Sequence, residues 1–270
     1  MVAVSGKERV GPGHLARITW LGHSTLLVEL DGTRVLTDPV LRDRVAHLQR
    51  TKPADAGLLH ALDGFLVSHL HYDHLDFPSL ERLGRSVPVV VPRGAGGLLR
   101  RRHFEQVVEV ETGQEIRLGD LAVRATPADH EGGRGFLGAE VAALGYLIRG
   151  SRQIYFAGDT DLFEGMATLA PDLDIALVPI WGWGPTLGPG HLDPRRAVEA
   201  LRLLCPRLAV PIHWGTYAPL GFGRLQTALL ADLVTEFRRH AAELAPEVEV
   251  RVLHLGGTLH LDAIPGGDRG

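Results

Sequence analysis

The stretch formed by residues 68–76, with the sequence SHLHYDHLD, constrains the fold of this chain more than any other. It directly follows the apolar run 65–67. That run is short, ends in a β-branched valine and is preceded by Gly64, so it is predicted to be a buried strand. A helix is predicted over residues 75–83. The polar cluster is therefore expected at the end of a core strand, where the chain turns into a helix.

Four residues of this stretch have side chains that bind metal ions. Strand alternation sends His69 and His71 to the same side, and the following turn brings Asp73 and His74 back toward them. Imidazole nitrogens and carboxylate oxygens suit zinc, manganese and iron. A histidine-rich surface turn is the alternative, but it would need neither a core strand before it nor matching residues elsewhere. The stretch is therefore predicted to bind metal.

Three further candidate ligands lie far along the chain, each just after a predicted strand. They are His130, Asp159 and His213. Gly158 allows a tight turn that points Asp159 off the end of its strand. A site that spans more than half of the chain cannot be divided into independent halves. We therefore expect one domain over residues 1–270, with flexible ends at 1–14 and 265–270.

Short apolar runs and turn residues predict the remaining elements. Strands are expected at 16–21, 25–30, 34–37, 65–67, 87–91, 107–110, 121–125, 146–149, 153–157, 174–180, 208–212, 248–253 and 258–261. Helices are expected at 75–83, 94–104, 195–204 and 225–244. Asp193 is the predicted N-cap of the third helix, with Pro194 in its first turn. Residues 41–62 and 131–145 are predicted to be loops, the first with one helical turn.

The composition is that of an ordinary globular protein, with 45% hydrophobic and 22% charged residues in a chain of 270. A formal net charge of −4 gives no basic field, so no nucleic-acid partner is expected. Cys205 is the single cysteine, which rules out an internal disulfide. No apolar stretch approaches the length of a membrane span. A cytoplasmic protein is expected, and self-association into a homo-oligomer stays open.

Two polar residues near the start of the chain have two interpretations each. Asp38 ends the strand 34–37, where an aspartate either caps the next turn or accepts a hydrogen bond from a ligand histidine and fixes its tautomer. His23 either faces the metal site or is a core or turn histidine.

Taken together, these residues resemble the metallo-β-lactamase fold superfamily. They form a His-x-His-x-Asp-His motif, a downstream histidine, a Gly-Asp-Thr aspartate and a late histidine, in that order. Further motifs resemble the branch that contains N-acyl-phosphatidylethanolamine phospholipase D and the ascorbate phosphate lactonases. These motifs are WLGHS at 20–24, LTDP at 36–39, FAGDT at 156–160, HLDP at 191–194 and HWGT at 213–216.

The resemblance implies an α/β fold, the αββα sandwich, in which two mixed sheets face each other with helices outside. It also implies two divalent metal ions per chain, with zinc favoured and manganese or iron as alternatives. The first ion would be held by His69, His71 and His130, and the second by Asp73, His74 and His213. Asp159 would bridge the two. Asp38 matches an aspartate that supports the ligands in this family.

The resemblance further implies a hydrolase that uses a metal-bridging hydroxide on a phosphoester, lactone or related ester of a small molecule. Asp73 is a candidate base or proton shuttle, or a ligand alone. His191 is a candidate general acid or anion-orienting group, or a residue that only packs before the helix. The expected substrate contacts are Trp181, Trp183, Trp214, Tyr217 and Arg134.

Two other classes of function are compatible with these residues. One is a metallo-oxidoreductase of the same fold, such as a persulfide dioxygenase, which the complete second ligand set disfavours. The other is a non-catalytic metal-binding protein, which a complete ligand set also disfavours.

Overall fold

The computed structural model describes residues 3–4, 16–133, 140–182, 186–221 and 223–261, with the backbone alone for 3–4 and 223–231. Apart from 3–4, the ends that were predicted to be flexible lie outside the described residues, as do Arg134 and Trp183. The described chain forms two large sheets, of seven and eight strands, and a small sheet of three strands.

The seven-stranded sheet has the order β18-β2-β3-β4-β7-β8-β9. It is antiparallel from β18 to β4 and parallel from β4 to β9. Asp31 and Gly32 have positive φ angles of 50° and 73°, as the two central residues of a tight hairpin turn between β3 and β4 require. The strands are β18 (Thr258–His260), β2 (Arg17–Gly22), β3 (Thr25–Leu30), β4 (Thr33–Thr37), β7 (Gly64–Leu66), β8 (Val89–Pro92) and β9 (Val107–Val110).

The eight-stranded sheet has the order β1-β10-β11-β12-β13-β14-β15-β17. Its strands are antiparallel from β10 to β13 and parallel from β13 to β17, and β1 pairs parallel with β10. The strands are β1 (Ala3–Val4), β10 (Glu115–Leu118), β11 (Leu121–Glu131), β12 (Ala142–Arg149), β13 (Gln153–Phe156), β14 (Ile175–Pro179), β15 (Leu208–Ile212) and β17 (Glu249–Val250).

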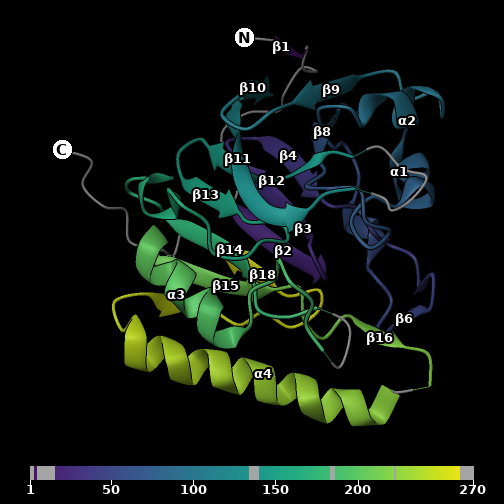
Figure 1. Ribbon diagram of the computed structural model, residues 1–270. Helices are drawn as coiled ribbons and strands as arrows, with labels where there is room; N and C mark the ends of the chain where they lie inside the picture. The colour runs from purple at the N-terminus through teal and green to yellow at the C-terminus, as the bar shows by residue number, and fades with distance from the viewer. Residues whose placement is uncertain (1–2, 5–15, 134–139, 183–185, 222, 262–270) are drawn as a thin grey trace.

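Successive side chains of a strand point to opposite faces of its sheet, and in both large sheets the side chains on both faces are buried. Val90 and Phe156 belong to the core between the sheets, whereas Val91 and Tyr155 pack on the outer faces under helices. Figure 1 shows α1 and α2 on one side of the sheets and α3 and α4 on the other. The helices are α1 (Phe77–Leu83), α2 (Gly96–Arg100), α3 (Pro194–Leu204) and α4 (Gly223–Leu244). The predicted αββα sandwich is therefore confirmed.

An aspartate caps the N-terminus of both α3 and α1. The carboxylate of Asp193 accepts a hydrogen bond from Arg196 N at 2.8 Å, and Pro194 opens α3. Asp76 caps α1 in the same way, so this helix begins two residues later than the predicted 75–83. Asp76 lies two residues after His74, and Asp193 lies two residues after His191, so both caps lie close to candidate site residues.

The predicted loop at 41–62 is partly wrong. It does contain one helical turn, η1 (Ala56–Leu58), but also the strands β5 (Arg44–Val45) and β6 (Leu48–Arg50). β6 pairs with β16 (Tyr217–Pro219), a segment far away in the sequence. Such a short strand has no local signature, because its pairing partner and its small apolar cluster come from elsewhere.

The predicted loop at 131–145 is also partly wrong. β11 extends to Glu131 and β12 begins at Ala142, so the two strands form a longer hairpin than the sequence indicates. A register shift between Pro127 and Glu131 interrupts the alternation that would have revealed the strand. His130 therefore lies within the irregular part of β11, near the end of this strand, rather than after a strand that ends at residue 125.

The chain topology gathers the candidate ligands at one edge of the sandwich. β4 and β7 are parallel neighbours, as are β13, β14 and β15, so their carboxyl ends face the same way within each sheet. Asp38, the 68–76 stretch, Asp159 and His213 follow these ends. No helix among the described residues is long and apolar enough to cross a membrane.

Candidate metal centre

Residues 67–76, here called the ligand loop, follow β7 and are anchored by their apolar side chains. Val67, Leu70 and Leu75 are fully buried in the cluster under α1, and they alternate with the polar residues. Leu70 N donates to Gly132 O at 2.9 Å, and His74 N and Leu75 N both donate to His71 O. This anchoring holds the histidines of the loop near His130, Asp159 and His213, which belong to or follow strands of the eight-stranded sheet.

His69, His71 and His130 form one group whose ligand atoms lie within 4.8 Å of one another. Nε2 of His130 lies 3.3 Å from Nδ1 of His71, and the His69 ring centroid is 4.5 Å and 4.7 Å from those of His71 and His130. Nε2 of His69 is buried and has no hydrogen-bond partner. A buried ring nitrogen without a partner is costly unless it binds an ion, so its position fits a metal ligand.

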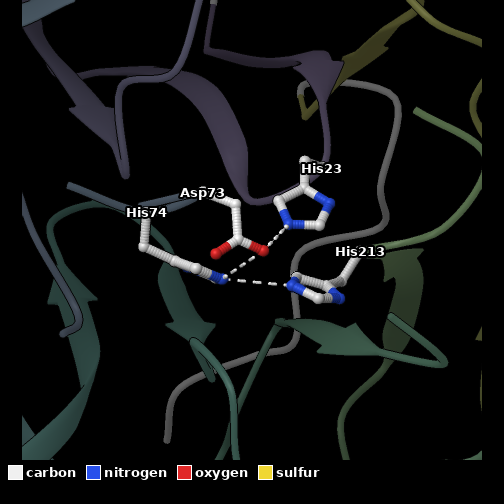
Figure 2. A group of neighbouring side chains, drawn as sticks. All are labelled: His23, Asp73, His74 and His213. Atoms are coloured by element: carbon white, nitrogen blue, oxygen red, sulfur yellow. Dashed lines mark hydrogen bonds and ion pairs between the residues drawn. The ribbon is translucent and has the colours of Figure 1, made fainter. Parts of the chain in front are cut away.

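Asp73, His74 and His213 belong to a second group, which Figure 2 shows. Nε2 of His74 lies 3.1 Å from Nε2 of His213 and 3.9 Å from Oδ2 of Asp73. Three donor atoms at these separations are spaced like the corners of a coordination shell with bonds of about 2.0–2.2 Å.

Asp159 lies between the two groups. Its Oδ2 is 3.1 Å from His74 Nε2 and 4.0 Å from His69 Nε2, and its Oδ1 is 3.1 Å from His213 Nε2. Gly158 places it there with a φ of 64°, and a Cβ at this glycine would lie 2.8 Å from Ser68 Cβ. Oδ2 thus faces His69 of the first group and His74 of the second, while Oδ1 faces His213. A carboxylate within reach of both groups is suited to bridge two cations.

Hydrogen bonds fix the tautomer of four histidines. Nδ1 of His74 donates to Asp38 Oδ2 at 2.7 Å. Nδ1 of His213 donates to Trp181 O at 2.7 Å, and Nδ1 of His130 donates to Gly190 O at 2.9 Å. Ser68 Oγ donates to Asp38, so it accepts from His69 Nδ1 at 2.9 Å. Each ring therefore presents the lone pair of Nε2 to the centre.

The backbone is strained around the centre. His23, Asp38 and His213 have φ angles of 53°, 33° and 62°, in the left-handed region that residues other than glycine rarely adopt. Conformations of this kind persist only where the surrounding structure holds them, and they gather at functional sites.

Burial and neighbouring charges set the pKa values of the site residues. Burial lowers the pKa of His69 well below its usual range and that of His130 to about 4. Burial also opposes the ionised form of Asp159, but His213 and His74 hold its pKa well below the ordinary value. The pKa of His74 is raised despite burial, because the carboxylates of Asp159 and Asp38 stabilise its proton. A cation would take over the charge of that proton. The donor set fits divalent metal ions.

His191 lies beside the centre, two residues before the N-cap of α3 as predicted. Its Nε2 is 3.5 Å from Asp159 Oδ2, and its ring centroid is 4.6 Å from that of His130. Nδ1 faces the carbonyl oxygens of Gly188 and Pro189 at 3.2 Å and 3.0 Å. Burial lowers its pKa, but the Asp159 carboxylate and these carbonyls outweigh that effect and raise it.

The residues predicted to contact substrate have varied surroundings. Trp181 is half-buried and its carbonyl orients His213. Trp214 stacks on Trp20 with ring centroids 5.4 Å apart, and Tyr217 is buried with its hydroxyl donating to Arg42 O at 3.1 Å. The side chains of Trp214 and Tyr217 thus both have partners inside the protein.

His23, whose role the sequence left open, also belongs to the second group. It is buried, its Nε2 lies 3.0 Å from Asp73 Oδ2, and its ring lies 3.7 Å from that of His213 between centroids. Burial lowers its pKa to about 3, so the ring is neutral. Like most of the candidate ligands it lies just after a strand, which is the one sequence signal that pointed to it.

Comparison with known proteins identifies the class to which this fold and site belong. Residues 33–214 match the family model of the beta-lactamase superfamily domain. The chain therefore belongs to the β-lactamase superfamily.

Relatives with similar sequences narrow the position within this family. A metal-dependent hydrolase of Methanopyrus kandleri is 31% identical over 253 residues, which cover 89% of this chain and 97% of that protein. An N-acyl-phosphatidylethanolamine-hydrolyzing phospholipase D of Caenorhabditis elegans is 33% identical, covering 75% of this chain and 64% of that protein. An uncharacterized Mycobacterium tuberculosis protein is 35% identical over 79% of this chain, which spans 63% of its length. The predicted resemblance is confirmed.

Solved structures share the fold. A metallo-hydrolase of Ignicoccus hospitalis superposes with a TM-score of 0.70 at 24% identity, over 90% of this chain and 97% of that one. The diiron β-hydroxylase CmlA of Streptomyces venezuelae also has a TM-score of 0.70, at 22% identity over 92% of this chain and 55% of that one. The same fold is thus used by a metallo-hydrolase and by a diiron β-hydroxylase.

Proposed function

We propose that this chain is a metal-dependent hydrolase that cleaves a phosphoester, lactone or related ester of a small molecule, with two divalent cations held by seven residues. The observation that carries the proposal is the bridging position of Asp159 between the two groups of donor atoms. A relative of similar length, from Methanopyrus kandleri, is named a metal-dependent hydrolase, which supports the reaction class.

The ligand roles follow from the two groups. His69, His71 and His130 would hold the first cation, and Asp73, His74 and His213 the second, with Asp159 shared. Two bound cations supply Lewis acidity, which brings the pKa of water toward neutrality and offsets negative charge on the substrate. Zinc is the favoured ion because imidazoles dominate the set, and manganese or iron fit the same donors.

His191 is proposed to give a proton to the leaving group. Its Nε2 faces the centre while its Nδ1 is directed at two backbone carbonyls, which favour a proton on Nδ1 and fix the orientation of the ring. A side chain held just before a capped helix has a fixed direction and still reaches the metal centre. The geometry fits a general acid, and an anion-orienting role uses the same Nε2.

Asp73 is proposed to act mainly as a ligand. Its carboxylate is almost fully enclosed by histidines, and its pKa lies far below the ordinary range because the His23 hydrogen bond and the neighbouring histidines outweigh burial. A carboxylate that is ionised and engaged in this way is a weak base, so the alternative role as a proton shuttle is less well supported.

A substrate screen tests the proposal. Protein reconstituted separately with zinc, manganese and iron is assayed on bis-p-nitrophenyl phosphate, p-nitrophenyl phosphate, lactones and a thioester, with Asp159→Ala as the matched control. Hydrolysis of at least one ester by the wild type, and not by the control, is expected. Full metal loading without any hydrolysis would overturn the proposal, and oxygen consumption by the iron form would favour the metallo-oxidoreductase instead.

A further inference from the structure

His23 lies in the turn between β2 and β3 and contacts Asp73 within the second group. We infer that His23 is a positioning residue of the metal centre: its Nε2–H holds the carboxylate of Asp73 in the orientation that metal binding requires. This inference rests on the proposed function, because it assigns a role toward the metal that Asp73 is proposed to bind.

The contact is a buried hydrogen bond. Nε2 of His23 lies 3.0 Å from Oδ2 of Asp73, and the exposed fractions of the two side chains are 1% and 13%. Figure 2 shows Oδ2 of Asp73 between His23 on one side and His74 on the other. A carboxylate has lone pairs for more than one partner, so Asp73 can accept from His23 and still bind an ion.

The main chain of His23 is held by Trp20 nearby and by two residues from far along the sequence. His23 N donates to Thr216 Oγ1 at 2.6 Å, and His23 O accepts from Trp20 Nε1 at 2.9 Å and from His213 N at 3.1 Å. These bonds hold the residue in its left-handed conformation, with a φ of 53°. The bond from His213 N also ties the His23 turn directly to a proposed ligand of the same cation.

The hydrogen bond assigns His23 the role of a donor. A neutral imidazole carries one N–H, and the bond to the Asp73 carboxylate requires that this hydrogen is on Nε2. While that bond exists, Nε2 has no lone pair to offer a cation. His23 therefore acts on the metal through Asp73, in the way that histidines and carboxylates behind other metal ligands do.

Zinc binding distinguishes the donor role from other roles of His23. Metal-free wild type, His23→Ala and His23→Gln are titrated with zinc in competition with a chromophoric chelator, and the melting temperature of each metal-free protein is measured. Gln places an N–H near the position of Nε2 but is a poor zinc ligand. We expect His23→Ala to bind the second zinc roughly 10–100-fold more weakly, and His23→Gln to recover most of that loss.

Two further variants keep the result interpretable. Tyr217→Phe removes the hydroxyl that bonds Arg42 O and Arg50 Nη1. It keeps the ring that lies 5.3 Å from that of His23 between centroids and leaves the bond to Asp73 intact, so it should bind zinc like the wild type. His23→Leu fills the site without a donor and replaces the Ala variant if that protein does not fold.

The outcomes separate this inference from the proposed function. Unchanged zinc affinity in His23→Ala, or a Gln variant as weak as Ala with an equal melting temperature, would overturn the inference and leave the hydrolase proposal intact. A wild type that binds no second zinc would overturn both. A failed ester screen with normal zinc binding would overturn the hydrolase proposal alone.

Discussion

Asp38 and His74 form a fully buried pair, with Oδ2 of the carboxylate 2.7 Å from Nδ1 of the ring. The same carboxylate accepts hydrogen bonds from Ser68 N at 2.7 Å and Ser68 Oγ at 2.6 Å. Burial raises the pKa of Asp38, while His74 and Ser68 act against that effect. One side chain thus fixes both the start of the ligand loop and the orientation of a proposed ligand.

Replacing Asp38 with Asn should weaken metal binding by roughly 10–100-fold, because an amide keeps the shape but loses the charge that orients and polarises His74. Chelator competition measures the affinity. Asp63→Asn is the matched control, since Asp63 accepts from Arg34 N at 2.8 Å at the opposite end of β7. Equal zinc affinities for the two variants would contradict the orienting role.

Metal analysis should return two divalent ions per chain. Asp159→Ala should lose both ions, because its carboxylate lies between the two groups, whereas His213→Ala should lose mainly the second ion. Elemental analysis of protein dialysed against metal-free buffer gives the stoichiometry. Less than one ion in metal-replete wild type would rule out the dinuclear centre, and a normal content in Asp159→Ala would rule out the bridge.

His191→Ala should lower turnover roughly 10²-fold or more and leave the metal content unchanged, because the other residues fill both sites and a general acid contributes about that factor. Turnover, metal content and melting temperature are measured on one preparation. A variant as active as the wild type would return His191 to a packing role. Loss of metal would instead identify it as a ligand.

Gly158→Ala should destabilise the fold by about 1–3 kcal/mol and reduce metal binding, since it combines a left-handed φ with close contacts. A Cβ would lie 2.8 Å from Ser68 Cβ and 2.9 Å from Leu144 O. Gly165→Ala is the control, with a φ of 85° and no atom within 4 Å of the added carbon. Urea unfolding compares the two, and equal losses would mean that backbone conformation alone requires glycine at 158.

Metal removal should lower the melting temperature, because the ions stabilise only the folded protein. Zinc affinity should also fall as the pH is lowered. Burial opposes a proton on His74, but Asp159 and Asp38 raise its pKa, and that proton must leave before Nε2 binds an ion. Zinc titrations at pH 6 and pH 8 in two buffers of different ionisation enthalpy measure proton release. Affinity that does not change with pH would contradict this linkage.

The sequence alone located most of the candidate centre, because its signals are local. An apolar run followed by His69, His71, Asp73 and His74 marks a strand end whatever the strand packs against, and the order of the motifs carried the resemblance that implied the αββα fold. The cap at Asp193 was readable for the same reason, since its partner is three residues away.

Tertiary structure decided what depends on partners distant in the chain. β6 exists because it pairs with β16, and the hairpin of β11 and β12 extends because each strand completes the hydrogen bonds of the other. His23 had two equal interpretations until the fold brought Asp73 within 3.0 Å of its ring. A histidine carries no mark of its role in its own segment, because that role depends on which donor, acceptor or ion the folded chain places beside it.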